Sequence, residues 1–214
     1  GVGIPNFWLT AMKNNRLLER EVMPPDEPIL KHLVDISLSN ELPEQPGREG
    51  FRLLFEFSPN EYFTNRVLVK TYILDEDDDD TLDNVLGTEI NWKEGKNVTM
   101  RTVTKKQKKK GKERVVTVKE PLDSWFTFFS PPEMPEDEDE LDDMEAEALQ
   151  DALEGDYDVA QCYKDKLIPN AVQWYLGEAE DDSDDEDYDD DDDDDGSDFE
   201  WGASRKKQKR PMPA

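Results

Sequence analysis

Residues 51–58 read FRLLFEFS and alternate between a wholly apolar face and a mixed one. A period of two places these two sets of side chains on opposite faces of a β-strand. Because one face is entirely apolar, we expect this strand to cover a hydrophobic core. The apolar face consists of Phe51, Leu53, Phe55 and Phe57, and the other face consists of Arg52, Leu54, Glu56 and Ser58.

Two further strands are expected beside this one. Residues 35–42 alternate isoleucine and leucine with serine, and residues 67–74 (VLVKTYIL) also alternate. A loop rich in proline, glycine and charge precedes residue 51, and a Pro59-Asn60 turn follows residue 58. Such short connections favour antiparallel pairing. The pattern predicts an α+β fold, in which one sheet face is solvated and helices cover the other.

Apolar residues at spacings of three and four predict several helices. Pro5, Asp26 and Asp156 occupy positions where a helix start favours proline or an N-capping carboxylate. Gly177 is typical of a helix end. The expected helices cover residues 5–14, 26–34, about 141–153, 156–167 and 172–176.

A basic stretch separates two β-prone runs, residues 90–104 and 115–119. This arrangement predicts a β-hairpin over about residues 98–119 with a basic tip. The tip could be a solvated turn or a nuclear-import signal, and direct nucleic-acid binding is disfavoured by the net charge of −28. A second basic cluster lies near the end of the chain. The candidate import residues are Lys105, Lys106, Lys108, Lys109, Lys110, Lys112, Arg114, Arg205, Lys206, Lys207, Lys209 and Arg210.

Charge divides the chain into two parts. Residues 1–120 hold 21 acidic and 19 basic side chains, whereas residues 121–214 hold 33 acidic and 7 basic ones. Within residues 178–200, 17 of 23 residues are Asp or Glu. Like-charge repulsion and the lack of apolar surface predict a disordered tail over residues 178–214 after a folded domain at 1–177. A polyanion of this kind is expected to meet a polycation.

Catalytic and metal-binding patterns are not found in the sequence. The single histidine, His32, and single cysteine, Cys162, cannot form a zinc set, which needs about four ligands. The acidic run at residues 75–80 lacks the glycine and glutamate of a calcium loop. No apolar run approaches the roughly 20 residues of a membrane span. We therefore expect neither an enzyme nor a bound metal or cofactor, and no membrane partner.

Several sequence blocks resemble the nucleosome assembly protein family of histone chaperones. They include residues 3–11 (GIPNFWLTA), 59–65 (PNEYFTN), 90–99 (INWKEGKNVT) and 124–129 (SWFTFF), in family order over about residues 3–180. The resemblance implies a four-stranded antiparallel sheet with helices on one side and a protruding β-hairpin. It also implies homodimerisation through a long helix N-terminal to this domain. The chain starts at Gly1 without that helix, so we expect a fragment of a longer protein.

The resemblance further implies a function. An acidic surface and acidic tail would bind core histones, chiefly the dimer that flanks the central tetramer, and would promote nucleosome assembly without binding specific DNA. The hairpin tip would bind a nuclear-import receptor, so the protein would shuttle between nucleus and cytoplasm. The candidate histone-binding residues are Glu19, Glu21, Asp26, Glu27, Glu133, Asp181, Asp182, Asp184, Asp185, Glu186 and Asp187. Ser183 and Ser197, each followed by acidic residues, are candidate phosphorylation sites.

Other functions stay open at this point. The same fold could serve an acidic nuclear adaptor or a phosphatase-inhibitor-type protein, with histones incidental. The aspartate runs could also buffer cations weakly. Binding to purified histones across a salt series separates these alternatives from the histone chaperone.

Overall fold

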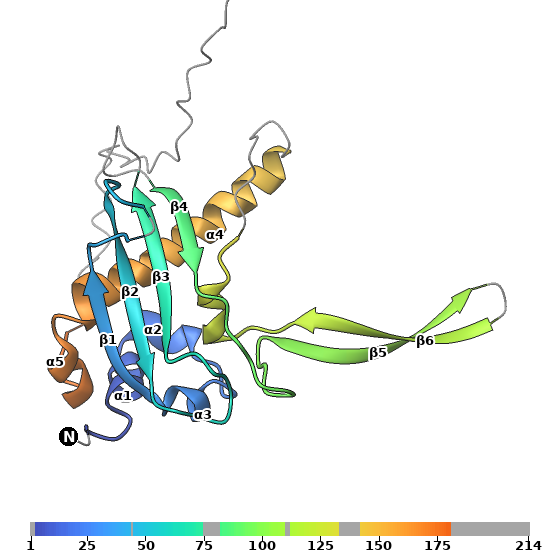
Figure 1. The fold of residues 1–214 in the computed structure, drawn as a ribbon, viewed down its shortest axis with the longest axis horizontal. Coiled ribbons are helices and arrows are strands. Elements are labelled where there is room, and N and C mark those ends of the chain that lie inside the picture. The colour runs from blue at the N-terminus through green and yellow to red at the C-terminus, as the bar shows by residue number, and fades with distance from the viewer. Residues whose placement is uncertain (1–2, 44, 75–81, 110–111, 133–141, 181–214) are drawn as a thin grey trace, which may run out of the picture.

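The computed structural model describes residues 3–43, 45–74, 82–109, 112–132 and 142–180, with the side chains of 105–109, 112–116 and 143 excepted. Four strands form one antiparallel sheet in the order β1-β2-β3-β4 (Figure 1). They are β1 (Leu33–Ser39), β2 (Gly50–Phe57), β3 (Val67–Leu74) and β4 (Leu82–Gly87). The register places Phe55 of β2 opposite Ile36 of β1 and Leu68 of β3. The predicted antiparallel α+β fold is confirmed.

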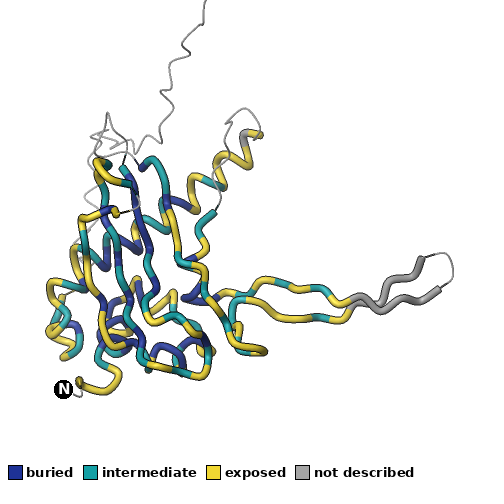
Figure 2. Tube along the Cα trace, in the orientation of Figure 1, coloured by how far each residue is buried: buried dark blue, intermediate teal, exposed yellow. Residues whose placement is uncertain are grey.

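The apolar face of β2 lies against the helical layer, as its alternation predicted. Phe51, Leu53, Phe55 and Phe57 are all buried, and the helices lie on this one side of the sheet (Figures 1 and 2). The Phe55 ring lies 5.3 Å from Trp125, 5.4 Å from Phe129 and 5.2 Å from Tyr163, measured between ring centroids. Edge-to-face packing of this kind stabilises a core beyond the area it buries.

The helical layer is assembled from both ends of the chain. It contains α1 (Phe7–Asn14), α2 (Arg16–Glu21), α3 (Glu27–Leu30), the 3-10 helix η1 (Trp125–Phe129), α4 (Asp143–Gln161), the π-helix η3 (Cys162–Leu167) and α5 (Ala171–Leu176). The Asn14 amide at the end of α1 donates to the Trp174 carbonyl of α5 at 2.7 Å. The Phe7 and Tyr175 rings stack at 5.0 Å, so the first helix packs on the last.

Helix boundaries differ from the sequence-based expectation at two aspartates. The helix expected over residues 26–34 is α3 and ends at Leu30, because β1 begins at Leu33. Asp26 makes no capping bond, since its carboxylate is buried and bonded elsewhere. Asp156 starts no helix, because it lies within α4, which begins instead at a capping box formed by Asp142 and Glu145.

Three further segments were mispredicted or missed. Residues 90–99 form no strand of a sheet, and their β-pairing is the isolated bridge between Phe63 and Trp92. The turn at Gly95, with φ of +71°, ends any extended run there. Helix α2 was missed because Asn15, interpreted as a stop, accepts hydrogen bonds from the Leu17 and Leu18 amides and so starts a second helix. The resemblance implied a fourth strand, but the residues that form β4 were not identified.

A two-stranded hairpin projects from this body (Figure 1). Strands β5 (Met100–Lys109) and β6 (Lys112–Pro121) pair antiparallel from Met100 opposite Pro121 to Lys109 opposite Lys112. An ion pair between Arg101 and Glu120, at 2.9 Å, joins the strands near their base. The protruding hairpin that the sequence implied is therefore present. No helix within the described ranges is long and apolar enough to cross a membrane.

Candidate functional site

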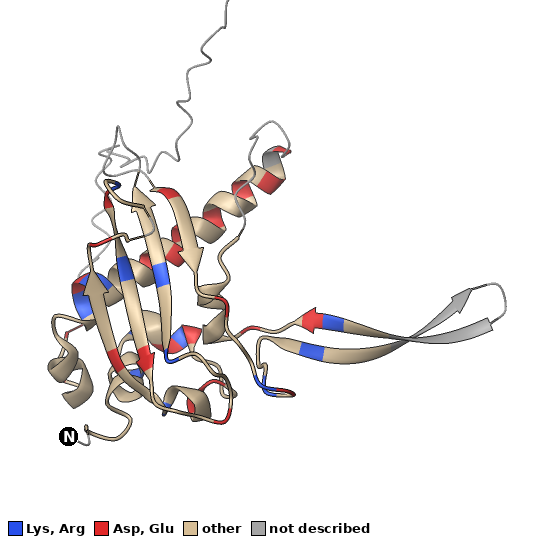
Figure 3. Cartoon of the chain, viewed as in Figure 1, with Lys and Arg blue, Asp and Glu red and all other residues tan. Residues whose placement is uncertain are grey.

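Helix α4 is the most acidic element of the described structure. Its sequence, DMEAEALQDALEGDYDVAQ, holds seven carboxylates and no Lys or Arg. Figure 3 shows acidic bands along its length. The capping box at its start satisfies two backbone N–H groups, which stabilises a helix end that makes few core contacts. An uninterrupted anionic helix of this kind can bind basic groups.

The two halves of α4 have different surroundings. Residues 144–148 and 150–152 are exposed, and Met144 keeps 79% of its accessible surface. In the second half Leu153, Val159 and Ala160 are buried. Figure 2 shows this change from exposed to buried along the helix. The acidic N-terminal half therefore presents its side chains to solvent, while the C-terminal half fixes the helix to the sheet.

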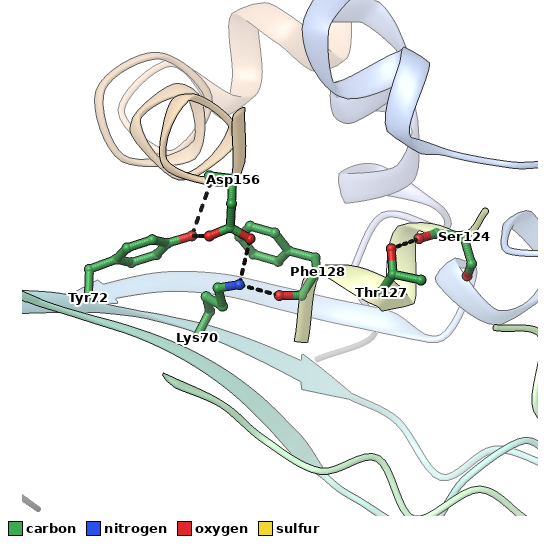
Figure 4. A network of polar contacts seen from close by, with 6 residues as sticks. All are labelled: Lys70, Tyr72, Ser124, Thr127, Phe128 and Asp156. Atoms are coloured by element: carbon green, nitrogen blue, oxygen red, sulfur yellow. Dashed lines mark hydrogen bonds and ion pairs between the residues drawn. The ribbon is translucent and has the colours of Figure 1, made fainter. Parts of the chain in front are cut away.

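A buried ion pair anchors the second half of α4. Lys70 of β3 is fully buried, and its Nζ lies 2.6 Å from Oδ1 of Asp156 (Figure 4). The same ammonium donates to the Phe128 carbonyl and lies 4.5 Å from the centroid of the Phe128 ring. The Tyr72 hydroxyl donates to Oδ2 of Asp156 at 2.7 Å. Three elements, β3, η1 and α4, thus meet at the Lys70 ammonium group.

Burial shifts the pKa values around this anchor. Burial lowers the pKa of Lys70, and the Asp156 carboxylate opposes that shift through its charge and hydrogen bond. Burial, and then the charge of Asp156, raise the pKa of Tyr72 well above its ordinary range. Desolvation, and then the charge of Asp156, also raise the pKa of Glu21. Their contacts with Asp156 inside the core make Lys70 and Tyr72 structural groups.

A second buried carboxylate joins α3 to η1. Asp26 accepts hydrogen bonds from the Ser124 hydroxyl at 2.6 Å, the Trp125 amide at 2.7 Å and the Met23 amide at 3.0 Å. Ser124 caps η1, and its carbonyl accepts from the Thr127 hydroxyl at 2.6 Å (Figure 4). Asp26 is fully buried. The prediction that Asp26 contacts histones is therefore wrong, because its carboxylate offers no surface to a partner.

The remaining predicted site residues are only partly brought together. Glu19 and Glu21 lie exposed on α2, and the charge of Asp156 reaches Glu21. Glu27 pairs with Lys13 at 2.5 Å, and this partner, through its hydrogen bond and then its charge, lowers the pKa of the Glu27 carboxyl. The other predicted histone-binding residues lie outside the described residues. They are Glu133, Asp181, Asp182, Asp184, Asp185, Glu186 and Asp187.

The candidate import and phosphorylation residues are described in part or not at all. The backbone of Lys105, Lys106, Lys108, Lys109, Lys112 and Arg114 lies in β5 and β6, and their side chains are not described. Lys110, the cluster at residues 205–210, Ser183 and Ser197 lie outside the described residues. Among the residues that are described, no group of three His, Cys, Asp or Glu side chains could hold a metal ion.

Sequence reasoning missed the residues that organise this surface. Helices were expected over about residues 141–153 and 156–167, but none of their carboxylates was proposed as a site. Lys70 was missed because a lysine in a strand is usually exposed. The usable signal was the pairing of Lys70 with Leu68 and Tyr72 at a period of two, which places all three on the core face.

The fold and the acidic helix define a class of protein, an α+β domain that carries an acidic, partly exposed helix. The family model described as "Nucleosome assembly protein (NAP)" matches residues 1–178. The chain belongs to this family.

Individual relatives agree with this assignment. The chain is 46% identical over 181 residues to Nucleosome assembly protein 1;3 of Nicotiana tabacum. The matched region covers 84% of this chain and 47% of the relative. It is 45% identical over 178 residues to Nucleosome assembly protein 1;2 of Arabidopsis thaliana, covering 83% and 46%. The chain thus spans about half the length of the curated relatives it matches.

A solved structure shows the same fold. The structure of Nucleosome Assembly Protein 1 from Plasmodium knowlesi superposes with a TM-score of 0.59 at 33% identity, covering 81% of this chain and 68% of the other. The agreement supports the arrangement of sheet, helices and hairpin described above.

Proposed function

We propose that this chain is the histone-binding part of a histone chaperone. It binds core histones, chiefly the dimer that flanks the central tetramer, shields them from non-specific DNA contacts and promotes nucleosome assembly. The names of its relatives attach nucleosome assembly to those proteins, and the family relation supports the same role here. The observation that carries the proposal is α4, with seven carboxylates, no basic residue and an exposed N-terminal half.

The physical basis is competition with DNA for the same basic side chains. One exposed ion pair contributes about 0–1 kcal/mol, so no single carboxylate binds a histone firmly. A row of carboxylates on α4, together with the acidic residues 178–200, sums many such pairs and is expected to weaken as salt rises. The anchored helix gives orientation, and the acidic run beyond it raises the rate of capture. No catalytic step is part of this proposal.

The test neutralises the exposed carboxylates of α4 and measures binding to purified histone dimers and tetramers from low to high salt. A matched control removes the same number of charges from exposed loop positions. We expect the α4 variant to bind several-fold more weakly at low salt and the control to bind like the parent chain. Equal binding by both would remove the role of α4. The α4 variant is Glu147→Gln with Asp151→Asn, and the control is Glu41→Gln with Glu94→Gln.

We also propose nuclear import through the basic residues of the hairpin. The backbone of Lys105, Lys106 and Lys108 lies in a projecting two-stranded ribbon, and basic clusters of this length recur in import signals. Shuttling between nucleus and cytoplasm would follow from import through them. Replacing Lys105, Lys106 and Lys108 with alanine in a fluorescent fusion should shift the protein toward the cytoplasm. The same replacement at Lys206, Lys207 and Lys209 tests the C-terminal cluster. Homodimerisation of the longer protein rests on the family relation and is tested by light scattering.

A further inference from the structure

A groove runs along the outer edge of β4. Two short segments line it, Asn84–Gly87 with Glu89 on one side, and Phe129–Pro132 on the other. Its volume is about 560 Å³, within the range of roughly 300–1,000 Å³ that holds ligands in proteins. Leu86 in its lining is 41% exposed. Neither the ion-pair anchor nor the exposed half of α4 contributes to this groove.

The two walls of the groove touch at one point. A Cβ atom at Gly87 would lie 2.0 Å from the Phe129 carbonyl oxygen, so the two backbones approach as closely as a glycine allows. Ser130, Pro131 and Pro132, which follow Phe129, line the groove as well. The spacing of the walls is therefore fixed at Gly87 and Phe129.

The wall has no free N–H group to offer to the strand that faces it. The Ser130 amide already donates to the Thr127 carbonyl at 2.8 Å, and Pro131 and Pro132 have no N–H group. The three carbonyl groups of the wall can accept hydrogen bonds but the wall has no free N–H to give. An extended segment with N–H donors would complement it, and the wall itself cannot fill that role.

The backbone of β4 faces the groove at alternate residues. Leu86 pairs with Thr71 and Asn84 pairs with Ile73, and the Thr88 amide donates to the Val69 carbonyl of β3 at 2.9 Å. In an antiparallel ladder the intervening residues, Val85 and Gly87, then point their backbone groups away from β3. In the described part of the chain β4 has no strand on that side. An exposed edge of this kind accepts an added strand.

The charge in the described lining of the groove is negative. Glu89 is the charged residue in its lining, and no lysine or arginine lines it. The chain enters β4 directly after residues 75–80 (DEDDDD) and continues from Pro132 into residues 133–140 (EMPEDEDE). The sequences joined to the groove walls thus carry twelve acidic residues and no basic one. A strand that adds here should be basic.

We propose that the β4 groove binds an extended, lysine- and arginine-rich polypeptide segment by strand addition. This inference rests on the proposed function and makes it more specific, because the segment would be a histone tail. Backbone hydrogen bonds to Val85 hold the segment, Leu86 contacts its apolar side chains, and the Glu89 carboxylate attracts its charges. The groove therefore adds a directional contact to the non-directional attraction of the acidic helix and tail.

The test uses the chain of 214 residues and a fluorescein-labelled lysine-rich peptide in a fluorescence anisotropy titration. Leu86→Arg places a positive charge and extra bulk in the groove. Leu38→Arg is the matched control, since Leu38 is 37% exposed and lies on β1, the opposite edge of the sheet. A second peptide of the same sequence carries N-methyl groups on alternate backbone nitrogens, which removes hydrogen-bond donors and keeps every charge.

Strand addition predicts that N-methylation weakens binding about tenfold, because it removes one to two backbone hydrogen bonds. Leu86→Arg should also weaken binding, through the positive charge and bulk that it places in the groove, and Leu38→Arg should not. Whole histone dimers should still bind Leu86→Arg through α4 and the tail. Equal binding of both peptides by the parent chain would overturn the groove proposal and leave the chaperone proposal standing. The titration is repeated on a chain that lacks residues 205–210. If Leu86→Arg weakened peptide binding only when residues 205–210 are present, the groove proposal would also be overturned, since the groove would then hold the chain's own basic segment. Failure of the parent chain to bind whole histones would overturn the proposed function.

Discussion

The two ion pairs Lys70–Asp156 and Lys13–Glu27 have nearly the same length, 2.6 and 2.5 Å, but opposite surroundings. Lys70 is fully buried and Asp156 is nearly so, whereas the side chains of Lys13 and Glu27 keep 40% and 38% of their accessible surface. The same two charges therefore have different roles. In the core the pair fixes a helix to a sheet, and at the surface the pair adds little. The distance between the charged atoms alone does not determine how much an ion pair contributes to stability.

The largest expected effect comes from breaking the buried pair. Lys70→Met leaves the Asp156 carboxylate without a cation in a low-dielectric site, and we expect a loss of about 3–5 kcal/mol in the free energy of unfolding. Lys13→Met, the matched surface change, should cost less than about 1 kcal/mol. Urea denaturation of the two variants measures both. Similar losses in the two variants would mean that burial does not separate these pairs.

Alkaline pH should lower the free energy of unfolding through two buried tyrosines, Tyr72 and Tyr163. Burial raises the pKa of both Tyr72 and Tyr163 above the ordinary value near 10, so the folded state keeps both phenols protonated. Above pH 10 the unfolded chain loses those protons and is stabilised by about 1.4 kcal/mol per pH unit for each tyrosine. Stability present below pH 10 is thus lost as pH rises, and the lowered pKa of Lys70 offsets part of that loss.

The measurement is a spectrophotometric titration of phenolate absorbance on the parent chain and on Tyr72→Phe. The two curves should coincide until the protein unfolds, because Tyr72 does not ionise in the folded state. A smaller absorbance change in Tyr72→Phe near pH 10, with the fold intact, would show that Tyr72 is not shielded.

A smaller effect is expected at the free end of α4. Asp142→Ala removes the N-cap whose carboxylate accepts from the Glu145 amide at 2.9 Å. Loss of an N-cap costs about 1 kcal/mol of helix stability. Because this half of α4 is exposed, the cost should appear as faster amide hydrogen exchange at residues 144–148 and not as global unfolding. Unchanged exchange there would mean that the cap does not hold this half of the helix.

The smallest effect on stability is expected from the exposed carboxylates of α4. Glu147→Gln should change the free energy of unfolding by less than about 0.5 kcal/mol, because the side chain is exposed and makes no described contact. It should still weaken histone binding at low salt. Thermal unfolding and a binding titration on the same variant test this separation. A large loss of stability would place Glu147 among the structural residues.

The sequence predicts the strands better than it predicts the anchor. The alternation in residues 51–58 and 67–74, and the aromatic group at 125–129, each identify an element from its own residues. By contrast, Asp26 and Ser124 are 98 positions apart, and Lys70 and Asp156 are 86 apart. Both aspartates occupy positions that a local rule assigns to helix caps, and only the folded chain supplies the partners that use them otherwise. The sequence shows that the α4 region is acidic. It does not show that the second half packs on the sheet while the first half stays exposed, and the proposed role depends on that difference.

The contact between α1 and α5 has a consequence for biosynthesis. Asn14 and Trp174, which share a hydrogen bond, are 160 residues apart in sequence. At about 5–20 residues per second, α1 leaves the ribosome on the order of 10–30 s before α5 can reach it. During that interval the apolar side of α1, with Trp8 and Met12, lacks its final cover, so nascent chains of this domain should depend on protection by chaperones until translation passes Trp174.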